Sequence, residues 1–330
     1  MKRRLGGGSL LLGLTLGLCG SAAAAPTVVL EPVGKISGPV DMVRAQGDRL
    51  YVSAHKTFTI YDVANPSEPQ QKGSYEFPEE IWNFRLDRDR AYVGANFFGL
   101  GILDISDPAT PKLAGSHKTL GQAKVGAAFG SKIVIIDHME GVVVIDASKE
   151  AEPSGLGSFF VDGYARDVLT SGSIAYAVDS PSGLYVFDLS RSGPLEPLSV
   201  LHAPGTPNSI EITAPSHGAA RLCGPGGGNL QIYDVSNPAE PLRASTFVTP
   251  GRAHRVSING DLVYVADGVA GLQVVDITNP VAPSLVATYP SARPARDVSV
   301  AGSYVFLVVG DSERQGNDRE IVILRIAGPE

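Results

Sequence analysis

The sequence is poor in cysteine, with two residues among 330, and it contains a single tryptophan. Cys19 lies in an N-terminal apolar segment that we expect to be removed. Its loss leaves Cys223 alone and excludes an intramolecular disulfide. Cys223 ends the strand-like run AARLC, and we interpret it as a buried small apolar residue rather than a nucleophile.

Basic residues are fewer than acidic ones, with 27 Lys and Arg against 34 Asp and Glu. Loss of Lys2, Arg3 and Arg4 with the N-terminal segment changes the formal net charge from −7 to −10. An acidic surface repels phosphate groups, so the composition argues against nucleic acid and against an anionic membrane as partners.

The sequence has no apolar run long enough to remain as a membrane span. The apolar segment Leu10–Leu18 is too short to cross a bilayer. It follows three basic residues and precedes four alanines, which is the pattern of a secretory signal with a cleavage site after Ala24. We therefore predict a signal peptide over residues 1–24 and a secreted protein, periplasmic or extracellular. Lipid anchoring at Cys19 is disfavoured because Leu18 stands where a lipobox has a small residue.

Apolar stripes with helical period are also lacking, and a longer repeat is present instead. Its clearest copy is GLQVVDITNPVAP, residues 271–283. The aspartate of this unit recurs every 42 residues, with one step of 46, at Asp62, Asp104, Asp146, Asp188, Asp234 and Asp276. A degraded seventh copy ends the chain at Ile321–Ala327, with Arg325 in place of the aspartate. A period of about 40–45 residues built from short strands is typical of β-propeller blades.

Each repeat has the pattern of four strands. In the sixth repeat these are residues 253–258, 262–266, 271–275 and 284–289, separated by turn residues such as Asn259-Gly260-Asp261. The repeat aspartate opens a turn, so we do not expect it to be catalytic. We predict an all-β, seven-bladed β-propeller with four-stranded antiparallel blades in a single domain over 25–330. The expected blades are about 39–78, 79–120, 121–162, 163–205, 206–251, 252–292 and 293–330.

The last repeat ends before a fourth strand, whereas residues 27–37 (TVVLEPVGKIS) precede the first repeat and have strand character. An incomplete blade would leave a bare sheet edge. We therefore predict that strand 27–37 pairs into the last blade and closes the ring.

The strings LQVVD (272–276), VVVID (142–146) and LYVFD (184–188) resemble the repeats of the LVIVD-repeat family of bacterial extracytoplasmic β-propeller proteins. The resemblance covers residues 27–330. It implies a β-propeller fold and an extracytoplasmic location, and it implies no specific function.

Antiparallel geometry places the start of every first strand and the end of every second strand at one rim. The column at the start of the first strands varies from blade to blade and is mostly polar, which favours ligand binding there: Asp41, Trp82, Lys124, Arg166, Asn208, His254 and Arg296. The next column is Met42, Asn83, Val125, Asp167, Ser209, Arg255 and Asp297. Because side chains alternate along a strand, only one column is expected to face the channel, and we favour the first.

Several first-column residues have two interpretations. Trp82 either stacks on a ligand or plugs a packing gap. Lys124, Arg166 and Arg296 bind a ligand carboxylate or phosphate, or they pair with Asp41, Asp167 and Asp297.

His55, His138 and His254 map to the same rim, near Asp137, Asp179 and Asp267. They are candidate ligands for a divalent metal, although ordinary polar rim histidines are the alternative.

No compact catalytic motif is present, and Gly224–Gly228 lacks the Lys and Ser or Thr of a phosphate-binding loop. We therefore favour a non-catalytic binding or scaffold module that engages a protein, glycan or small ligand at the upper face, with no cofactor predicted. The alternative is an enzyme with its site in the central funnel, such as a metal-assisted lyase or hydrolase using the three histidines. A quinone-dependent dehydrogenase is disfavoured because propellers of that class have tryptophan-rich docking motifs, whereas this sequence has one tryptophan.

Overall fold

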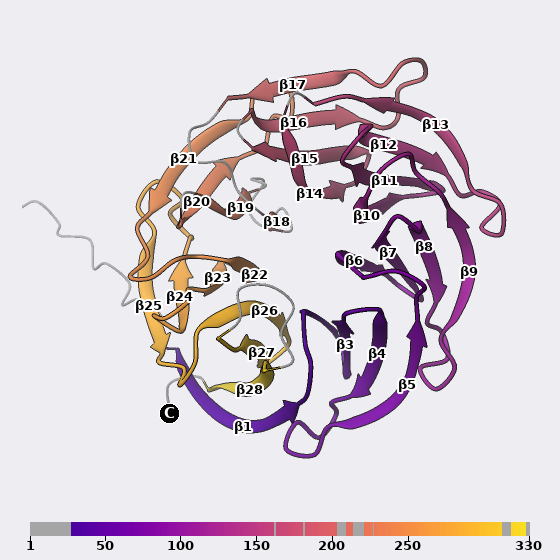
Figure 1. Ribbon diagram of the computed structural model, residues 1–330. Coiled ribbons are helices and arrows are strands. Elements are labelled where there is room, and N and C mark those ends of the chain that lie inside the picture. Colours follow the sequence, from indigo (N-terminus) through magenta and orange to yellow (C-terminus); the bar gives the residue numbers. More distant parts are fainter. Residues whose placement is uncertain are drawn as a thin grey trace, which may run out of the picture.

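The computed structural model describes residues 28–161, 163–180, 182–202, 209–213, 221–226, 228–311 and 318–327. Within these ranges the chain forms strands, turns and bends, without a helix (Figure 1). Accordingly, the described part contains no helix suited in length and hydropathy to cross a membrane.

The strands in chain order are β1 (Val29–Ser37), β2 (Met42–Gln46), β3 (Arg49–Ala54), β4 (Thr57–Asp62), β5 (Gln70–Glu76), β6 (Asn83–Asp87), β7 (Arg90–Asn96), β8 (Gly99–Asp104), β9 (Lys112–His117), β10 (Ala123–Phe129), β11 (Lys132–Asp137), β12 (Gly141–Asp146), β13 (Ser154–Phe159), β14 (Tyr164–Ser171), β15 (Ile174–Ser180), β16 (Gly183–Asp188), β17 (Pro197–Leu201), β18 (Glu211–Ile212), β19 (Arg221–Gly226), β20 (Asn229–Asp234), β21 (Leu242–Phe247), β22 (Arg255–Asn259), β23 (Leu262–Ala266), β24 (Leu272–Asp276), β25 (Ser284–Tyr289), β26 (Ala295–Ala301), β27 (Tyr304–Val309) and β28 (Glu320–Ala327). In the sixth repeat the second and fourth strands have the predicted bounds, and the other two lie within two residues of them.

Successive groups of four antiparallel strands lie around a common axis (Figure 1). Over the described residues, β2–β5, β14–β17, β18–β21 and β22–β25 are separate four-stranded sheets. Strands β6–β9 and β10–β13 share one eight-stranded sheet, because β7 also pairs with β10. The structure confirms an all-β propeller with four-stranded antiparallel blades.

The N-terminal strand completes the last sheet, as predicted. β1 pairs antiparallel with β28 from Val29↔Ala327 to Ser37↔Glu320, in a sheet ordered β1-β28-β27-β26. Arg325, which replaces the repeat aspartate, forms an ion pair with Glu31 of β1. The two ends of the described chain are therefore held in one sheet.

The hydrophobic core lies between neighbouring blades. Phe58 and Ile60 of β4 pack on Phe84 of β6, and the Phe58 and Phe84 rings meet edge to face at 5.0 Å between centroids. Inner strands have a neighbour on both faces, so they read as continuous apolar runs such as the buried VVVI of β12. Burying each large apolar side chain contributes about 1.5–3 kcal/mol.

The repeat aspartates form turns, as the sequence predicts. In each one the carboxylate accepts a hydrogen bond from the backbone N–H two residues later, at 2.7–3.1 Å; the residues are Asp62, Asp104, Asp146, Asp188, Asp234 and Asp276. Hydrogen bonds from Ala64 and Lys72 lower the pKa of Asp62, and those from Ser106 lower the pKa of Asp104. Both effects stabilise the ionised, turn-forming carboxylate.

Outer strands place a small residue against the turn of the next blade. A Cβ added at Gly115 of β9 would lie 1.6 Å from the carbonyl oxygen of Glu150, which follows β12. At an equivalent contact the hydroxyl of Ser245 donates to the carbonyl oxygen of Pro280 at 2.6 Å. The small side chains let successive blades lie close together.

Candidate ligand-binding face

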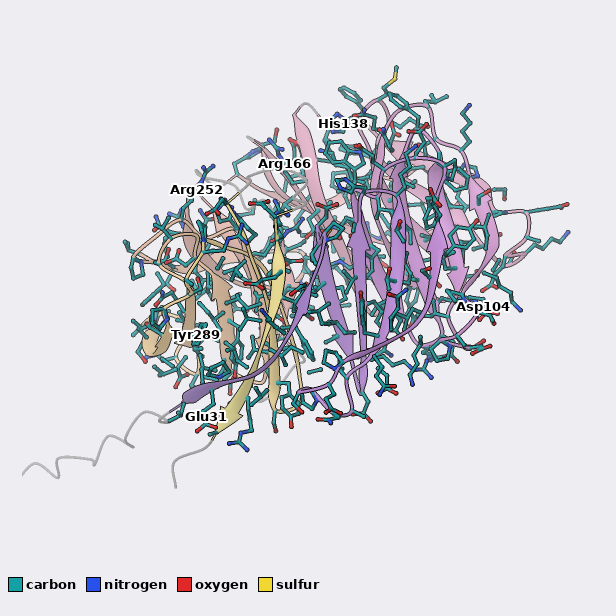
Figure 2. All side chains as sticks on the ribbon, turned by 60° about the horizontal axis from the view of Figure 1, so that its bottom comes forward. Glu31, Asp104, His138, Arg166, Arg252 and Tyr289 are labelled. Carbon is teal, nitrogen blue, oxygen red and sulfur yellow. The ribbon has the colours of Figure 1, made fainter. Side chains whose placement is uncertain are left out.

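One end of the propeller collects the starts of the innermost strands and the turns between the second and third strands; we call it the upper face. Figure 2 shows His138 and Arg166 at this end, whereas Glu31 and Asp104 lie at the opposite end. Antiparallel strand order places the described residues of the predicted first column at or near the upper face.

Below the upper face, Arg85 of β6 crosses the channel. Its guanidinium donates to Glu211 of β18 at 2.7 Å, to Asp167 of β14 at 3.0 Å and to the carbonyl oxygen of Ile210 at 3.0 Å. The Asp167 side chain is 0% exposed and the Arg85 side chain 13% exposed. A single arginine therefore ties together three blades that are distant in the sequence.

Further charges extend this channel network. Arg44 of β2 lies 3.3 Å from Asp297 of β26, and Arg255 of β22 lies 3.8 Å from Asp167. Burial lowers the pKa of Arg44, and its attraction to Asp297 opposes this effect. Burial also acts to lower the pKa of Arg85. Attraction to Asp167 and Glu211 outweighs this effect, so the pKa of Arg85 is raised. The channel thus contains three arginines and three carboxylates whose charges balance.

The second column supplies half of this network and the first column none of it, which corrects our expectation; Arg44, Arg85 and Glu211 lie two positions further along the chain than the second column. Asp167, Asp297 and Arg255 all belong to the second column. Their carboxylates also join neighbouring blades, because Asp167 accepts from the Ile210 N–H and Asp297 from the Val43 N–H, both at 3.0 Å.

Alternation itself accounts for this correction. Side chains two positions apart share a face, so the second column projects with Arg44, Arg85 and Glu211, and the ladders that begin at Met42, Asn83 and Arg255 are regular. In two other blades the register shifts between Ala165 and Asp167 and between Ala295 and Asp297, which leaves Arg166 and Arg296 as bulge residues, and Lys124 lies in a similar shift.

Two first-column residues on adjacent blades form an aromatic and cationic pair. The Lys124 ammonium lies 5.5 Å from the centroid of the Trp82 ring, and the Trp82 side chain is exposed. Burial, with repulsion from Arg166, lowers the pKa of Lys124 to about 8. Lys124 and the exposed Arg166 thus concentrate positive charge in one sector of an otherwise acidic protein.

The remaining first-column residues contact other rim groups. Asp41 accepts a hydrogen bond from the His55 N–H at 2.6 Å and lies 3.8 Å from Arg319. Arg296 donates to the carbonyl oxygen of Gly310 at 3.0 Å and lies 3.4 Å from the His254 ring. Asn208 lies outside the described residues.

The three candidate metal-binding histidines have different surroundings. His55 is in the β3–β4 turn beside Asp41, and His254 is beside Arg296. Burial and the charges of Lys124 and Arg166 lower the pKa of His138, and Asp137 opposes them. Across the described ranges, no three or more His, Cys, Asp or Glu side chains are grouped to hold a metal ion. A metal site at His55, His138 and His254 stays a prediction that this arrangement does not support.

The upper face carries a set of exposed apolar side chains, of which the sequence analysis had placed Trp82 at the rim and had missed Leu120, Met139 and Phe160. They lie at the rim or in its loops and are 44–75% exposed: Trp82, Phe97, Leu120, Met139 and Phe160. We call these five residues the apolar rim set. The signal in the sequence is a large apolar residue at a turn position, where polar residues are usual.

Asp137 links the loop that contains Leu120 to the loop that contains Met139. Its carboxylate accepts hydrogen bonds from the Gly121 N–H at 3.0 Å and from the Met139 N–H at 2.7 Å. In addition, the Leu120 N–H donates to Glu140 at 2.9 Å. These hydrogen bonds hold the loops that contain Leu120 and Met139 next to each other.

These repeated blades define a β-propeller repeat protein. The chain belongs to the LVIVD repeat family, whose model matches residues 37–76, 89–119, 162–201, 225–249, 250–290 and 292–313. Residues 120–161 lack such a match, although they form β10–β13 of the same pattern. No curated protein matches the sequence.

Solved propeller structures resemble the chain at low sequence identity. The β-propeller domain of Cps50 (Swd1) from Myceliophteria thermophila has a TM-score of 0.73 at 11% identity, covering 91% of this chain and 100% of that domain. A chain of the mitotic checkpoint complex has a TM-score of 0.70 at 9% identity, covering 96% and 98%. The computationally designed protein Ika8 has a TM-score of 0.59 at 9% identity, covering 90% and 99%. Identities this low establish the fold alone.

Proposed function

We propose that this protein is a secreted, non-catalytic, seven-bladed β-propeller that binds a protein partner at its upper face. The sheet composition and the pairing of β1 with β28 support the closed ring of seven blades. The N-terminal basic and apolar segment, with its small-residue cleavage site, supports secretion. Mass spectrometry of the exported protein tests secretion, with a mature N-terminus at Ala25 as the expected result.

The observation that carries the proposal is the apolar rim set beside Lys124 and Arg166. Exposed aromatic and aliphatic side chains around cationic groups are typical of interaction hot spots, in which apolar anchors are desolvated and charge sets specificity. The partner surface therefore combines apolar side chains with one or more carboxylates. A carboxylate bound there would also relieve the repulsion between Lys124 and Arg166.

The fold is compatible with such a role. Similar propellers include a domain of Cps50 (Swd1) and a chain of the mitotic checkpoint complex, which is a multiprotein assembly by name. Because fold does not fix function, the proposal depends on the rim residues and not on these similarities.

The test is capture of a partner from the compartment to which the protein is exported, followed by surface variants. Leu120→Asp and Arg166→Glu change the upper face, whereas Val281→Asp introduces the same charge at an exposed position of the lower face. We expect the two upper-face variants to reduce partner affinity at least tenfold and the Val281 variant to leave it unchanged. Equal loss in all three variants, or none in the first two, would refute the proposal.

A further inference from the structure

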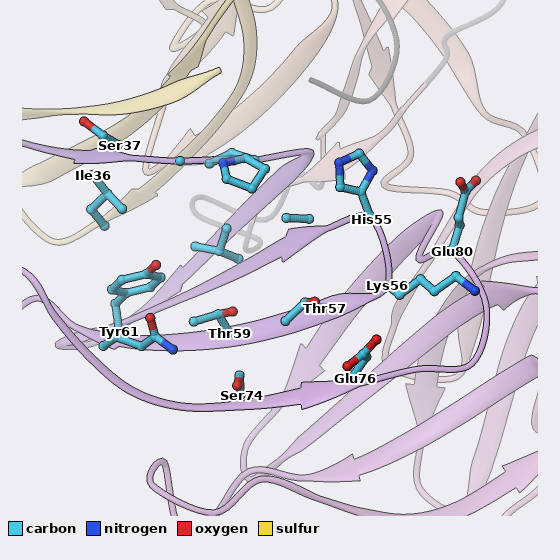
Figure 3. Close-up of a pocket in the computed structure, with 16 residues that line it drawn as sticks. Ile36, Ser37, His55, Lys56, Thr57, Thr59, Tyr61, Ser74, Glu76 and Glu80 are labelled. Atoms are coloured by element: carbon cyan, nitrogen blue, oxygen red, sulfur yellow. The ribbon is translucent and has the colours of Figure 1, made fainter. Parts of the chain in front are cut away.

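A concavity lies at the seam where the first and last repeats meet, and it reaches the upper face at the β3–β4 turn, where His55 and Lys56 line it. It has a volume of about 610 Å³ and is formed by the end of β1, the segment Gly38–Val40, and strands β4 and β5 (Figure 3). Volumes of about 300–1,000 Å³ are typical of small-molecule pockets.

A local departure from the repeat explains why this end of the blade is open. In four other blades the third strand begins with a left-handed glycine: Gly99, Gly141, Gly183 and Gly271. A Cβ at any of these glycines would lie 2.1–2.3 Å from a carbonyl oxygen at the end of the outer strand. The first repeat has Thr57 at this position, and Thr57 pairs with Glu76 in a regular ladder. The outer strand therefore cannot close over the start of β4 as it does over a glycine.

The pocket wall is more polar than the corresponding walls of the second and third blades, whereas the fifth and sixth blades also carry a polar residue, Gln231 or Gln273, at the position of Thr59. Thr57, Thr59 and Tyr61 alternate along β4 toward the pocket, while Phe58 and Ile60 point into the core and are fully buried. The residues that correspond to Thr59 and Tyr61 are Gly101 and Leu103 in β8, and Val143 and Ile145 in β12.

Figure 3 shows hydroxyl groups along the pocket and charged groups at one end. Thr57, Thr59 and Ser74 supply hydroxyls, and Tyr61 supplies a half-buried aromatic ring. Burial raises the pKa of the Tyr61 hydroxyl. At the other end, Glu76 and Glu80 are accompanied by Lys56, whose ammonium donates to the Pro78 carbonyl oxygen at 2.6 Å.

We propose that this seam pocket binds a neutral, hydroxyl-rich ligand, namely a monosaccharide or disaccharide. Side-chain hydroxyls both donate and accept hydrogen bonds, as sugar hydroxyls do. The Tyr61 ring offers an apolar face for the C–H side of a pyranose, and the carboxylates at the mouth accept hydrogen bonds from ligand hydroxyls. Carboxylates and a cation occur together, so the pocket does not select for one sign of ligand charge. Neither the apolar rim set nor Lys124 or Arg166 lines the pocket, so the proposal does not depend on protein docking at those residues.

The test uses the mature chain and five named probes: glucose, galactose, N-acetylglucosamine, maltose and cellobiose. Saturation-transfer NMR identifies a bound sugar, and titration of that sugar gives its affinity. We expect Thr59→Val, which removes one hydroxyl at constant shape, to weaken binding about tenfold, or about 1.4 kcal/mol. Thr59→Ser restores the hydroxyl and is expected to restore most of the affinity.

The matched control is Ser158, which occupies in β13 the position that Ser74 occupies in β5 and lies outside the pocket. Ser74→Ala is expected to weaken binding, and Ser158→Ala to leave it unchanged. The proposal is overturned if none of the five sugars binds or if Thr59→Val binds the sugar as tightly as wild type. It is also overturned if the polycation spermidine or the polyanion citrate displaces the sugar, because the pocket would then select for charge. Thermal melting of each variant shows that any loss of affinity occurs in a folded protein.

Discussion

Removal of the Arg85 side chain is the sharpest test of the channel network. In Arg85→Ala, the fully buried Asp167 loses the Nη2 group that contacts both of its carboxylate oxygens at 3.0–3.1 Å, and Glu211 loses a contact of 2.7 Å. Asp167 keeps hydrogen bonds from the Val168 and Ile210 N–H groups, and Arg255 remains at 3.8 Å. The substitution therefore leaves a buried carboxylate only partly compensated.

The cost follows from burial. Breaking a buried ion pair by removing one partner costs about 3–5 kcal/mol, and the remaining contacts of Asp167 favour the lower end, about 3 kcal/mol. At about 2 °C per kcal/mol for a domain of this size, the melting temperature is expected to fall by roughly 6 °C.

Arg90→Ala is the matched control. Arg90 also contacts two carboxylates, Glu150 at 2.9 Å and Asp104 at 3.0 Å, but its side chain is 29% exposed. Water replaces much of what an exposed ion pair provides, so this substitution is expected to cost no more than about 1 kcal/mol.

The assay is urea unfolding followed by circular dichroism, in which a lower midpoint at constant slope reports lost stability. In the double variant Arg85→Ala/Asp167→Asn the unpaired charge is gone, so part of the loss is expected to be recovered. Equal losses for Arg85→Ala and Arg90→Ala, or no recovery in the double variant, would show that buried charge compensation is not what Arg85 provides.

Three further predictions concern packing, closure and ionisation. Gly115→Ala forces its Cβ against the Glu150 carbonyl oxygen and is expected to cost at least about 2 kcal/mol, whereas Gly155→Ala in β13, with its nearest atom 3.9 Å away, is expected to change stability by less than about 0.5 kcal/mol. Equal urea midpoints for the two variants would contradict the close blade contact. Deletion of residues 25–37 removes β1 and exposes the edge of β28, so the melting temperature is expected to fall sharply; an unchanged value would count against closure by β1. Because the pKa of Lys124 is lowered from 10.5 to about 8, the unfolded chain binds more protons between these pH values, and stability rises with pH in this window. Lys124→Met is therefore expected to be more stable than wild type at pH 7, with a difference that shrinks toward pH 10; a pH-independent difference would exclude this ionisation as the cause.

Features with a local cause could be predicted from the sequence. Asp276 forms its turn with an N–H two residues away, and the same hydrogen bond recurs at Asp62 and the other repeat aspartates. The outer strand missing from the last repeat also predicted the pairing of β1 with β28, because a bare sheet edge is unfavourable.

The rim was predicted only in part. Trp82, Lys124 and Arg166 lie on the upper face as expected, because strand direction alternates regularly. Leu120, Met139 and Phe160 of the apolar rim set were missed, since apolar residues in a sequence are first assigned to the core, and only the fold shows which of them have no neighbour to cover them.

The sequence by itself determined the strand-and-turn unit, its repetition and the need for a closing strand, since these depend on contacts within one repeat or on the count of strands. Only the tertiary structure decided which column enters the channel, because regular alternation allows either one and Arg255 enters from a ladder without a bulge. It also decided that Arg85 meets Glu211, 126 residues away, because the width of the ring sets which side chains reach across. The opening beside Thr57 has the same origin, as a small change within one repeat becomes a pocket only when the first and last repeats are brought together.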